Sequence, residues 1–482
     1  MSTQDKYEAV IGLEVHTQLL THSKLFCGDD VSFGGAPNTQ VSAISLAHPG
    51  TLPVMNAKAV EFAVKLGLAF NCQIVTHNYF ARKNYFYPDL PKGYQISQHT
   101  TPICRNGFVT IEAESQRRDI RLNRIHLEED AGKSIHDADD RYTCIDLNRA
   151  GVPLLEIVSE PDMHSAEEAF AYVTEIRKMV RFLGICDGNM EEGSMRCDAN
   201  ISIRLKGDTR LGTKVEVKNL NSIRNVKRAI SHEIERLIGL KEHHQDIIQQ
   251  TRSFDASTGT TFSLRSKEEA NDYRYFPDPD LTPFEVNQAQ IDTIRTAMPE
   301  LPESLEKRFM EELGLPSSDA RVLSEDRETA ALFGQTIRHT PHYKAAANWI
   351  LGPVKSWLNE HNTTPASLNL SPVHFARLVD LVEEGAVSFG MAASRIFPEL
   401  VKSPQTEPKE IAASLNILQE NNQDALSAWV DEVLEKMPQK VQEYKKGKKN
   451  LIGLFSGEVK KISKGKADMR VVGEILKQKL NQ

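Results

Sequence analysis

The sequence predicts an α+β protein in which an N-terminal domain built on an antiparallel sheet is followed by an all-α domain and a small helical tail. Residues 196–205 and 213–219 alternate strictly between apolar and polar side chains, which is the period of strands with one buried face. From about Pro299 onward, apolar residues recur with helical spacing instead. A chain of 482 residues is too long for one hydrophobic core. We therefore expect three domains, at residues 1–290, 291–405 and 406–482.

Composition and cysteine usage favour a cytoplasmic globular protein. No apolar run is long enough to span a membrane, and the first ten residues lack the basic and apolar pattern of a signal peptide. The six cysteines are scattered and none forms a CxxC pair. This spacing indicates reduced thiols and argues against a disulfide framework or a closed zinc site.

The first predicted strand, within residues 10–20, places two polar side chains together. Glu14 and His16 are two positions apart, so both leave the strand on one face, while Leu13 and Val15 face the core. An apolar helix is expected at about residues 56–70.

A loop at residues 84–95 then combines tyrosine, phenylalanine and proline with neighbouring Arg82, Lys83 and Lys92. Its rings could stack on nucleic-acid bases or an adenine, or could simply pack together as a structural loop.

An acidic triplet, Glu128, Glu129 and Asp130, follows a strand-like stretch at residues 121–127. Adjacent carboxylates repel one another, so burying them requires a counter-charge. A bound Mg²⁺, Ca²⁺ or Mn²⁺ would supply that charge, because these cations prefer oxygen ligands. The alternative is an acidic turn exposed to solvent.

The next segments add further charged groups to strand faces. Glu156 lies within the apolar stretch 154–158, where it is either an edge residue facing solvent or a buried acid that needs a partner. Ser165 and Glu168 fit a capping box ahead of a helix with an apolar stripe at Phe170, Val173, Ile176, Val180 and Leu183. The polar faces of the two alternating segments carry Asp198, Arg204, Lys214, Glu216 and Lys218.

The number of acids on polar strand faces favours metal-dependent nucleotide chemistry. Two hard cations, with substrate phosphates completing their shells, suit this set better than a single acid and base pair does. Lys214, Lys218 and Arg204 could neutralise phosphoryl oxygens. A Walker A loop is excluded because its first glycine would fall at Leu127, and no GxGxxG follows a strand. The seven candidate site residues are Glu14, His16, Glu128, Glu129, Glu156, Asp198 and Glu216.

The C-terminal end carries a charge opposite to that of the remaining chain. Residues 436–482 hold thirteen Lys or Arg against four Asp or Glu, a balance of +9, which leaves −17 for the remainder of a chain with net charge −8. A basic tail on an acidic body indicates a polyanionic partner such as RNA. The alternative is an ordinary basic helix in solvent.

Several ordered stretches resemble the B subunits of the bacterial aspartyl/glutamyl-tRNA amidotransferases. The similarity covers essentially the full chain. It is carried by Gly12–His16, Tyr85–Gln95, His126–Lys133, Arg149–Glu156, Glu160–Asp162, Glu192–Asn200, Glu216–Ser222 and Asp272–Pro277.

The resemblance implies a cradle-shaped catalytic domain similar in fold to the glutamine synthetase catalytic domain. It also implies a heterotrimer with an amidase, the A subunit, and with a small C subunit. The amidase would release ammonia from glutamine. This chain would use ATP and Mg²⁺ to phosphorylate the side-chain carboxylate of misacylated Glu-tRNA(Gln) or Asp-tRNA(Asn), and ammonia would then displace the phosphate.

The resemblance also assigns the metal site to the same seven candidates, Glu14, His16, Glu128, Glu129, Glu156, Asp198 and Glu216. Many relatives carry a four-cysteine zinc site after the first strand. Here only Cys27 remains, while Asp29, Ser42 and Ser45 stand at the other three positions. We therefore expect no zinc.

Two other functions fit parts of the pattern. A free-standing ATP-dependent carboxylate–amine ligase for a small acid would share the acidic sheet but need no RNA-binding tail. A non-catalytic RNA-binding adaptor would need the tail but not the acids. The residues do not decide between Glu-tRNA(Gln) and Asp-tRNA(Asn) as substrate.

Overall fold

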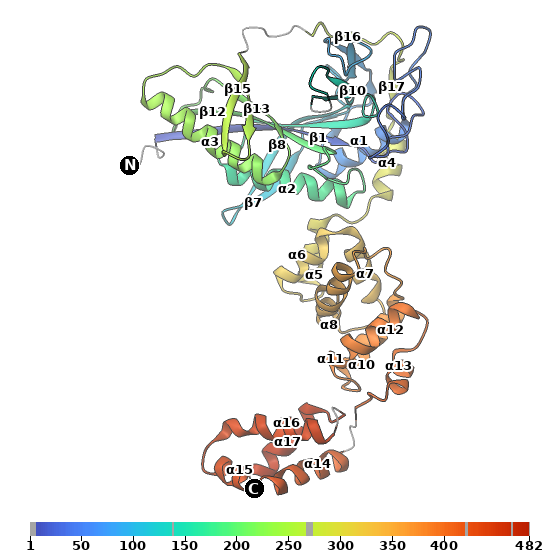
Figure 1. Ribbon diagram of the computed structural model, residues 1–482, viewed down its shortest axis with the longest axis vertical. Helices are drawn as coiled ribbons and strands as arrows, with labels where there is room; N and C mark the ends of the chain where they lie inside the picture. Colours follow the sequence, from blue (N-terminus) through green and yellow to red (C-terminus); the bar gives the residue numbers. More distant parts are fainter. Residues whose placement is uncertain (1–5, 137–138, 267–272, 420–422, 464–465, 482) are drawn as a thin grey trace. The chain divides into compact units, whose positions relative to one another are not determined.

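The computed structural model describes residues 6–136, 139–266, 273–419, 423–463 and 466–481 (Figure 1). The chain divides into two compact units, Met1–Glu300 and Leu301–Gln482. Among the described residues, the first unit contains all the named strands, and the elements of the second are helices. The predicted α+β class is confirmed. None of the described helices combines the length and apolar character that crossing a membrane requires.

One large sheet organises the first unit, with β1 near its middle. Its main path runs in the order β15 (Thr260–Ser266), β14 (Gln250–Asp255), β13 (Val215–Leu220), β12 (Met195–Leu205), β1 (Tyr7–Gln18), β11 (Pro153–Ser159), β8 (Gln116–Glu129), β5 (Tyr94–Ser97), β4 (Ala81–Asn84) and β16 (Phe276–Pro277). The other strands are β2 (Gln73–Ile74), β6 (Cys104–Arg105) and β7 (Phe108–Ala113) in the same sheet, the pair β9 (Lys133–Ile135) and β10 (Cys144–Asp146), and the pair β3 (His77–Asn78) and β17 (Phe284–Glu285).

Within the described parts of the chain, the strand pairs are antiparallel, as predicted, with one exception. Strand β13 pairs in parallel with β14. A helix, α3 (Ile223–Glu242), lies between these two strands in the sequence. Parallel neighbours need such a crossover, whereas antiparallel neighbours can be joined by a short turn. Helix α3 therefore provides the crossover that allows β13 and β14 to pair in parallel.

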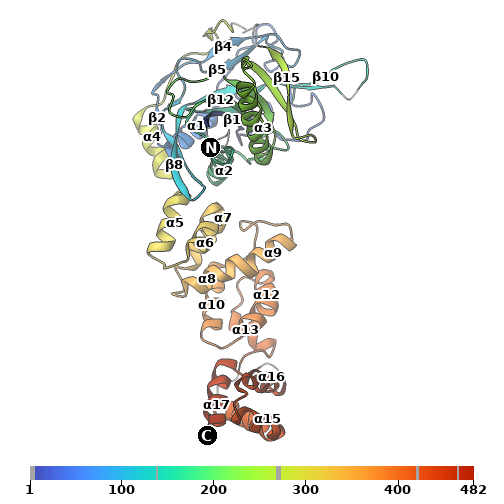
Figure 2. The same ribbon diagram turned by 90° about the vertical axis from the view of Figure 1, so that its left-hand side faces the viewer.

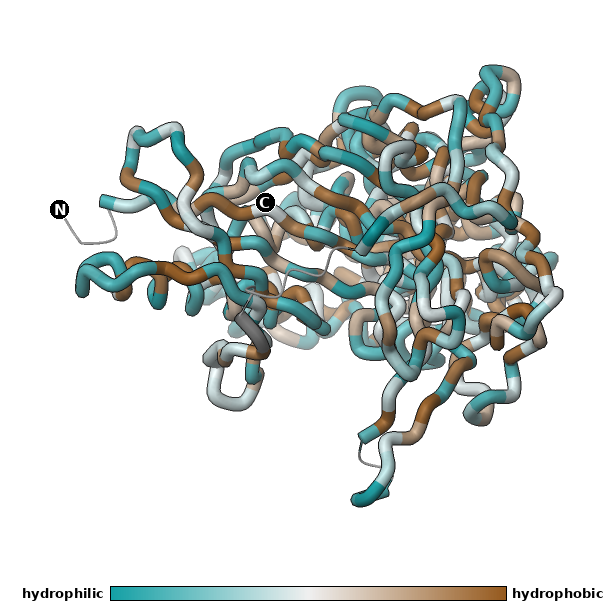
Figure 3. Tube along the Cα trace, turned by 90° about the horizontal axis from the view of Figure 1, so that it is seen from above, coloured by the Kyte–Doolittle hydropathy of each residue, from teal (hydrophilic) through white to brown (hydrophobic). Residues whose placement is uncertain are grey.

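The helices α1 (Ala57–Ala69), α2 (Ala166–Phe182) and α3 form one layer against the sheet (Figures 1 and 2). Helix α4 (Gln288–Ala297) packs on α1. Alternation along β1 turns Ile11, Leu13 and Val15 into the core, where each is at most 1% exposed. Figure 3 shows hydrophobic and hydrophilic residues interleaved along the chain in this unit.

Helix α2 differs from the predicted pattern in two details. Ser165 caps it by accepting a hydrogen bond from the Glu168 amide at 3.1 Å, as expected. The Glu168 carboxylate, however, accepts from the His164 amide at 2.6 Å, so the reciprocal half of the capping box falls one residue earlier. Phe170 is 41% exposed, which corrects its assignment to the buried stripe. The buried face is centred on Ala169, Tyr172, Val173, Ile176 and Val180, and Phe170 lies outside it.

The second unit consists of short helices around aromatic and aliphatic cores. Trp349 is 1% exposed and contacts the rings of Phe375, Phe389 and Phe397. A separate apolar core, which includes Leu426, Val430, Phe455 and Leu476, holds the last helices together. The helices are α5 (Pro302–Glu311), α6 (Ser317–Glu325), α7 (Arg327–Thr336), α8 (Tyr343–Trp349), η3 (Ile350–Val354), α9 (Lys355–Glu360), α10 (Pro372–Glu383), α11 (Phe389–Met391), η4 (Ala392–Ile396), α12 (Phe397–Lys402), α13 (Pro408–Ser414), α14 (Gln423–Lys436), α15 (Pro438–Lys445), η5 (Lys449–Leu451), α16 (Ile452–Ile462) and α17 (Met469–Asn481).

A buried ion cluster fastens the edge strands β14 and β15 to α3. Glu233 on α3 is fully buried and binds Arg252 on β14 at 3.0 Å and Arg236 one turn further along the helix at 2.7 Å. Thr261 on β15 also donates a hydrogen bond to its carboxylate. A buried carboxylate that balances two guanidinium groups is costly to remove, because their charges then lose their partner.

We therefore expect Glu233→Ala to lower the free energy of unfolding of the first unit by about 3–5 kcal/mol. Urea unfolding followed by far-UV circular dichroism would measure this change. The three tryptophans of the chain, at positions 349, 357 and 429, lie in the second unit, so their fluorescence provides an internal control. Glu235→Ala, at an exposed position on the same helix, should change stability by less than about 0.5 kcal/mol. Equal effects of the two substitutions would contradict this role.

Candidate functional site

The face of the sheet opposite helices α1–α3 collects the polar side chains. On β1, Glu14 lies opposite Asp198 of β12, and His16 lies opposite Glu156 of β11. On the next strand, β8, His126 lies opposite Glu156. Because facing residues in an antiparallel pair point to the same side, acids from distant parts of the chain meet here.

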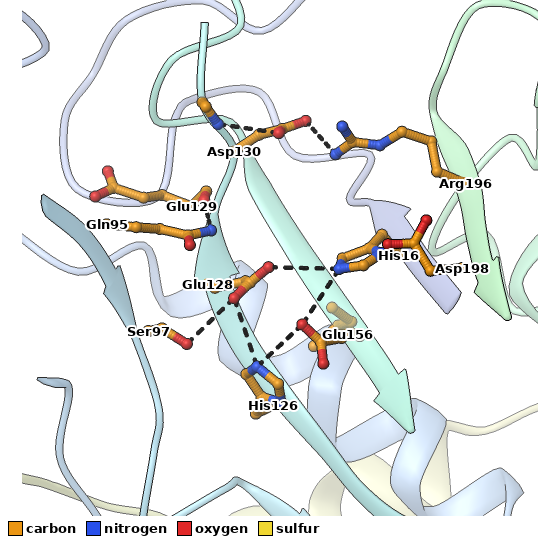
Figure 4. Close-up of polar contacts among 12 residues, drawn as sticks. His16, Gln95, Ser97, His126, Glu128, Glu129, Asp130, Glu156, Arg196 and Asp198 are labelled. Carbon is orange, nitrogen blue, oxygen red and sulfur yellow. Dashed lines mark hydrogen bonds and ion pairs between the residues drawn. The ribbon is translucent and has the colours of Figure 1, made fainter. Parts of the chain in front are cut away.

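The first group, which we call the His16 cluster, consists of His16, Glu128 and Glu156 (Figure 4). The His16 Nε2 atom lies 3.2 Å from Glu156 Oε2 and 3.8 Å from Glu128 Oε1. A second imidazole, His126, adjoins the cluster, with its Nε2 atom 3.5 Å from Glu128 and 3.6 Å from Glu156. Ser97 donates a hydrogen bond of 3.2 Å to Glu128 Oε2.

Charge in the His16 cluster is balanced between carboxylates and imidazoles. Burial opposes protonation of His16, but the hydrogen bond and charge of Glu156, helped by Glu128, raise the pKa of His16 to about 9. Burial likewise opposes ionisation of Glu156, yet His126 and His16 hold the pKa of that carboxyl below its ordinary value. Protonation of His16 thus supplies positive charge that offsets these acids, and a cation bound at this cluster would replace that proton.

The second group, which we call the Glu14 cluster, consists of Glu14, Asp198 and Glu216. It spans β1, β12 and β13, on the side of β1 away from β8. Burial, reinforced by the neighbouring Glu156 and Asp198 carboxylates, raises the pKa of Glu14 above its ordinary value. The direction of this shift means that negative charge at Glu14 is incompletely balanced by the protein.

Hydrogen bonds fix the orientation of each acid in the Glu14 cluster. Asn200 donates to Glu14 at 2.9 Å, the Asn219 amide donates to Asp198 at 2.9 Å, and Thr251 donates to Glu216 at 3.0 Å. The Asn219 amide reaches Asp198 because the β12–β13 register shifts between Cys197 and Ala199, and Asn219 has a positive φ of 61°. A bulge of this kind re-aims backbone groups locally.

The three cations predicted to bind phosphate have different surroundings. Lys218 belongs to the Glu14 cluster, with its Nζ 3.1 Å from Asp198 and 3.0 Å from Glu216. Lys214 is exposed and lines a groove beside Glu14. Arg204 instead forms an ion pair with Glu8 at 2.6 Å. Arg204 and Asp198 are six positions apart on β12, which is about 20 Å along the strand. Arg204 therefore lies apart from both clusters.

The structure does not bring Glu129 into either cluster, in contrast to its place in the predicted ligand set. Glu128 and Glu129 are consecutive on β8, so their side chains point to opposite faces. The Glu129 carboxylate binds the Lys92 ammonium and accepts a hydrogen bond from the Ile96 amide at 2.9 Å. Asp130, past the same strand, binds Arg196 and Gln18 at 2.8 Å each. Of the acidic triplet, Glu128 alone reaches the polar clusters.

Two residues of the site were not among the sequence candidates. His126 stands two positions before Glu128, so the same rule that paired Glu14 with His16 could have identified it. Lys83 on β4 has its ammonium 4.9 Å from the centre of the Tyr273 ring and faces Glu128 and Glu156. No local signal predicts Lys83, because β4 reaches the site only through its pairing with β5.

The aromatic loop is partly packed and partly exposed. Tyr94 lies against Arg82, whose guanidinium is 4.1 Å from the ring centre. Phe86 and Tyr87 are 87% and 55% exposed. Near Lys83, the rings of His99 and Tyr275 stack at 4.0 Å. Tyr94 therefore packs in the protein, as the structural interpretation of this loop expects, while stacking of Phe86 and Tyr87 on a base stays a prediction.

The loop after β1 brings together Cys27, Asp29, Ser42 and Ser45, the four positions where the resemblance predicts the cysteines of a zinc site in many relatives. The Cys27 sulfur lies 3.4 Å from the Ser45 hydroxyl, and Asp29 accepts hydrogen bonds from Ser45 and from the Ser42 amide. The fully buried Lys24 places its ammonium 3.4 Å from Ser45 and 4.0 Å from Asp29. Hydrogen bonds and a buried lysine thus hold this loop in the described structure.

The donor atoms of both clusters fit divalent cations. In each cluster, three ligand atoms lie within 4.8 Å of one another. Five of these six donors are carboxylates, a composition that favours Mg²⁺, Mn²⁺ or Ca²⁺ over zinc. The incompletely balanced charge at Glu14 is a further reason for a cation at this position. The arrangement could hold two cations side by side over an open polar surface.

Comparison with known proteins assigns both parts of the chain to described families. Residues 9–292 match the family described as the GatB/GatE catalytic domain, and residues 331–480 match the family described as the GatB domain. The first match contains both clusters.

Full-length relatives share one name, that of the B subunit of an aspartyl/glutamyl-tRNA(Asn/Gln) amidotransferase. The protein of that name from Geotalea uraniireducens (strain Rf4) is 50% identical over 481 residues, which cover 99% of this chain and 100% of the relative. The one from Geobacter sp. (strain M21) is 49% identical, over 98% of this chain and 99% of the relative. The one from Thermosynechococcus vestitus (strain NIES-2133 / IAM M-273 / BP-1) is 46% identical, over 98% and 97%.

Proposed function

The chain belongs to the family of aspartyl/glutamyl-tRNA(Asn/Gln) amidotransferase B subunits, and from this premise we propose that it uses ATP to activate the side-chain carboxylate of misacylated Glu-tRNA(Gln), Asp-tRNA(Asn) or both. Ammonia then converts the activated group into the amide, giving Gln-tRNA(Gln) or Asn-tRNA(Asn). The observation that carries the proposal is the pair of adjacent acidic clusters on one open sheet face.

The chemistry explains why such a site is needed. A carboxylate is a poor acyl donor, because its oxygen is a poor leaving group. In the proposed first step, an oxygen of the substrate's side-chain carboxylate attacks the γ-phosphorus of ATP. ADP departs, and an acyl phosphate forms on the aminoacyl side chain. Ammonia adds to the acyl carbon, and phosphate and a proton leave. The first step brings two anions together, so positioning and charge neutralisation supply most of the catalysis.

The residues of the two clusters divide this work. Glu14, Asp198 and Glu216 would hold one Mg²⁺, and His16, Glu128 and Glu156 the other. Mg²⁺, when bound, screens the repulsion between the substrate carboxylate and the γ-phosphate. Lys218 adds a fixed positive charge beside Asp198 and Glu216, and Asn200 orients Glu14. Glu129 is omitted from this ligand set because it is committed to Lys92.

The first unit, in our proposal, is a cradle related in architecture to the glutamine synthetase catalytic domain. Its broad open sheet with acids on one face supports that relation. The ammonia would come from glutamine through an amidase partner, the A subunit, in a heterotrimer that includes a small C subunit. The relatives are named as B subunits, which supports an assembly of several chains. We place this assembly in the cytoplasm, consistent with six free thiols.

The deciding assay combines the reconstituted complex with each misacylated tRNA, ATP and glutamine. We expect amide formation on the tRNA and ADP release that depends on misacylated tRNA. Glu156→Gln and Glu216→Gln should each lower both rates by at least about a hundredfold, because each removes charge from one cluster. Glutamine hydrolysis by the partner reports that the complex still assembles. Amidation that proceeds without ATP would overturn the proposal, and ADP release with free glutamate alone would favour a small-acid ligase.

Metal stoichiometry tests the division into two clusters independently of turnover. Titration of the full chain with Mn²⁺, followed by electron paramagnetic resonance, should give two bound ions. Glu156→Gln and Glu216→Gln should each reduce the number to one within the titrated range, since each disrupts a different donor set. Glu129→Gln is the matched control and should retain two. Loss of an ion in this control would show that the carboxylate leaves Lys92 to bind metal.

The basic C-terminal helices are proposed to bind the tRNA backbone. Four lysines lie from the last residue of α15 to the residues just before α16: Lys445, Lys446, Lys448 and Lys449. The segment that contains them has a net positive charge. Replacing these four lysines by serine should weaken tRNA binding and reduce the slope of log K against log[salt] by about 0.7–0.9 for each phosphate that is no longer bound. Lys58→Ser on α1 serves as a control. An unchanged salt slope would remove this segment from the tRNA interface.

A further inference from the structure

The imidazole of His126 lies beside the His16 cluster without belonging to its donor set. The residue is buried, and its Nε2 atom lies 3.5 Å from Glu128 Oε2 and 3.6 Å from Glu156 Oε2. His16 approaches the same two carboxylates from β1, at Glu128 Oε1 and Glu156 Oε2. Figure 4 shows the two acids between the two rings. The proposed set of metal ligands leaves the second ring without a role.

The surroundings of His126 determine which of its nitrogens carries the proton. Arg124 stands two positions earlier on β8, on the same face of the strand, and its Nε–H group donates a hydrogen bond of 3.4 Å to His126 Nδ1. A nitrogen that accepts a hydrogen bond has no proton of its own, so the ring proton lies on Nε2. The Nε2 atom therefore points a donor at the acids and has no lone pair to offer a cation.

The two oxygens of Glu128 have different partners as a result. Its Oε2 atom accepts a hydrogen bond from the Ser97 hydroxyl at 3.2 Å and lies next to the Nε2–H group of His126. Its Oε1 atom faces His16. Burial opposes ionisation of Glu128, but the hydrogen bond from His126 holds the pKa of that carboxyl below its ordinary value. Protein donors thus hold one oxygen and leave the other at the proposed cation position.

We propose that His126 is a positioning residue for the His16 cluster. Its Nε2–H group orients the Glu128 and Glu156 carboxylates toward a divalent cation that it does not itself touch. Arg124 selects the tautomer that makes this donation possible. Hydrogen bonds of this kind to metal-binding side chains commonly change metal affinity by tenfold to a hundredfold. The inference rests on the proposed function and adds two residues that prepare one of its metal sites.

Arg124 has a second effect of opposite sign on cation binding. Its guanidinium lies 3.9 Å from Glu156 Oε1, so its charge competes with a cation for that carboxylate. If charge alone mattered, removing Arg124 would tighten cation binding. If Arg124 fixes the tautomer of His126, its removal frees Nδ1 to take the proton and weakens binding. The sign of the change therefore separates the two effects.

The test measures Mn²⁺ binding to the full chain by electron paramagnetic resonance. The chain carries Glu216→Gln, which leaves the His16 cluster as the intact donor set. His126→Asn should raise the Kd for Mn²⁺ by about tenfold or more, whereas His126→Gln should stay within about threefold. The glutamine amide nitrogen reaches nearly as far as the histidine Nε2, but the asparagine amide ends near Nδ1. A packing role alone predicts no such rescue by glutamine.

The Glu14 cluster provides an internal control for folding. In a chain that carries Glu156→Gln, it is the intact donor set, and His126→Asn should change its Kd for Mn²⁺ by less than about twofold. His232→Asn, on helix α3 and outside both clusters, is the matched control for loss of an imidazole. It should leave both Kd values unchanged.

Arg124→Ala tests the tautomer step. In the Glu216→Gln chain it should raise the Kd for Mn²⁺ by about threefold or more. In a chain that also carries His126→Gln, the same substitution should not raise the Kd, because an amide has no ring tautomer to select. A lower Kd in both chains would show that Arg124 acts through its charge and would overturn the tautomer step.

The outcomes distinguish failure of this inference from failure of the proposed function. If His126→Asn binds Mn²⁺ at the His16 cluster as tightly as the parent chain, or if His126→Gln is no better than His126→Asn, the role of His126 is overturned and the proposed function stands. If the Glu216→Gln chain binds no Mn²⁺ at all, the proposed division into two metal sites fails, and the role of His126 fails with it.

Discussion

Repulsion among five carboxylates on one sheet face is the constraint on which the site depends. Glu14, Glu128, Glu156, Asp198 and Glu216 are all at least partly buried, where like charges interact strongly. The protein balances them unequally. Two imidazoles face Glu128 and Glu156, whereas Lys218 faces Asp198 and Glu216. The remaining imbalance falls at Glu14, whose pKa is raised. A site with this charge distribution is suited to cations and to phosphates that arrive with them.

The packing of the large sheet holds these five carboxylates close together despite their repulsion. Helices α1–α3 cover one face, and the apolar side chains of β1 and β12 fill the space between. Strand register then fixes which acids meet, because Glu14 faces Asp198 and His16 faces Glu156 directly. Shifting β1 by one residue would turn Glu14 and His16 into the core. Apolar packing on the helix-covered face therefore fixes the strand register, and this register fixes which side chains meet on the polar face.

The site is also directional. Along the strand order, the Glu14 cluster extends from β1 toward β12 and β13, whereas the His16 cluster and Lys83 extend from β1 toward β11, β8 and β4. In the proposed reaction, a nucleotide phosphate is transferred to a carboxylate on a much larger RNA, so separate approaches would serve the two substrates. The proposal places the transferred phosphoryl group between the two clusters.

The sequence alone determined the class of the fold, the shared face of Glu14 and His16, and the acids available for metal chemistry, because two-residue and 3.6-residue periods are local properties. It also carried the family resemblance. Tertiary structure decided which acids converge: Glu128 joins His16, while Glu129 turns to Lys92. It also placed His126 and Lys83 beside the acidic clusters and Arg204 away from them. The groove beside Glu14 is likewise formed by the tertiary structure. These outcomes depend on register between strands far apart in the chain, which no local pattern encodes.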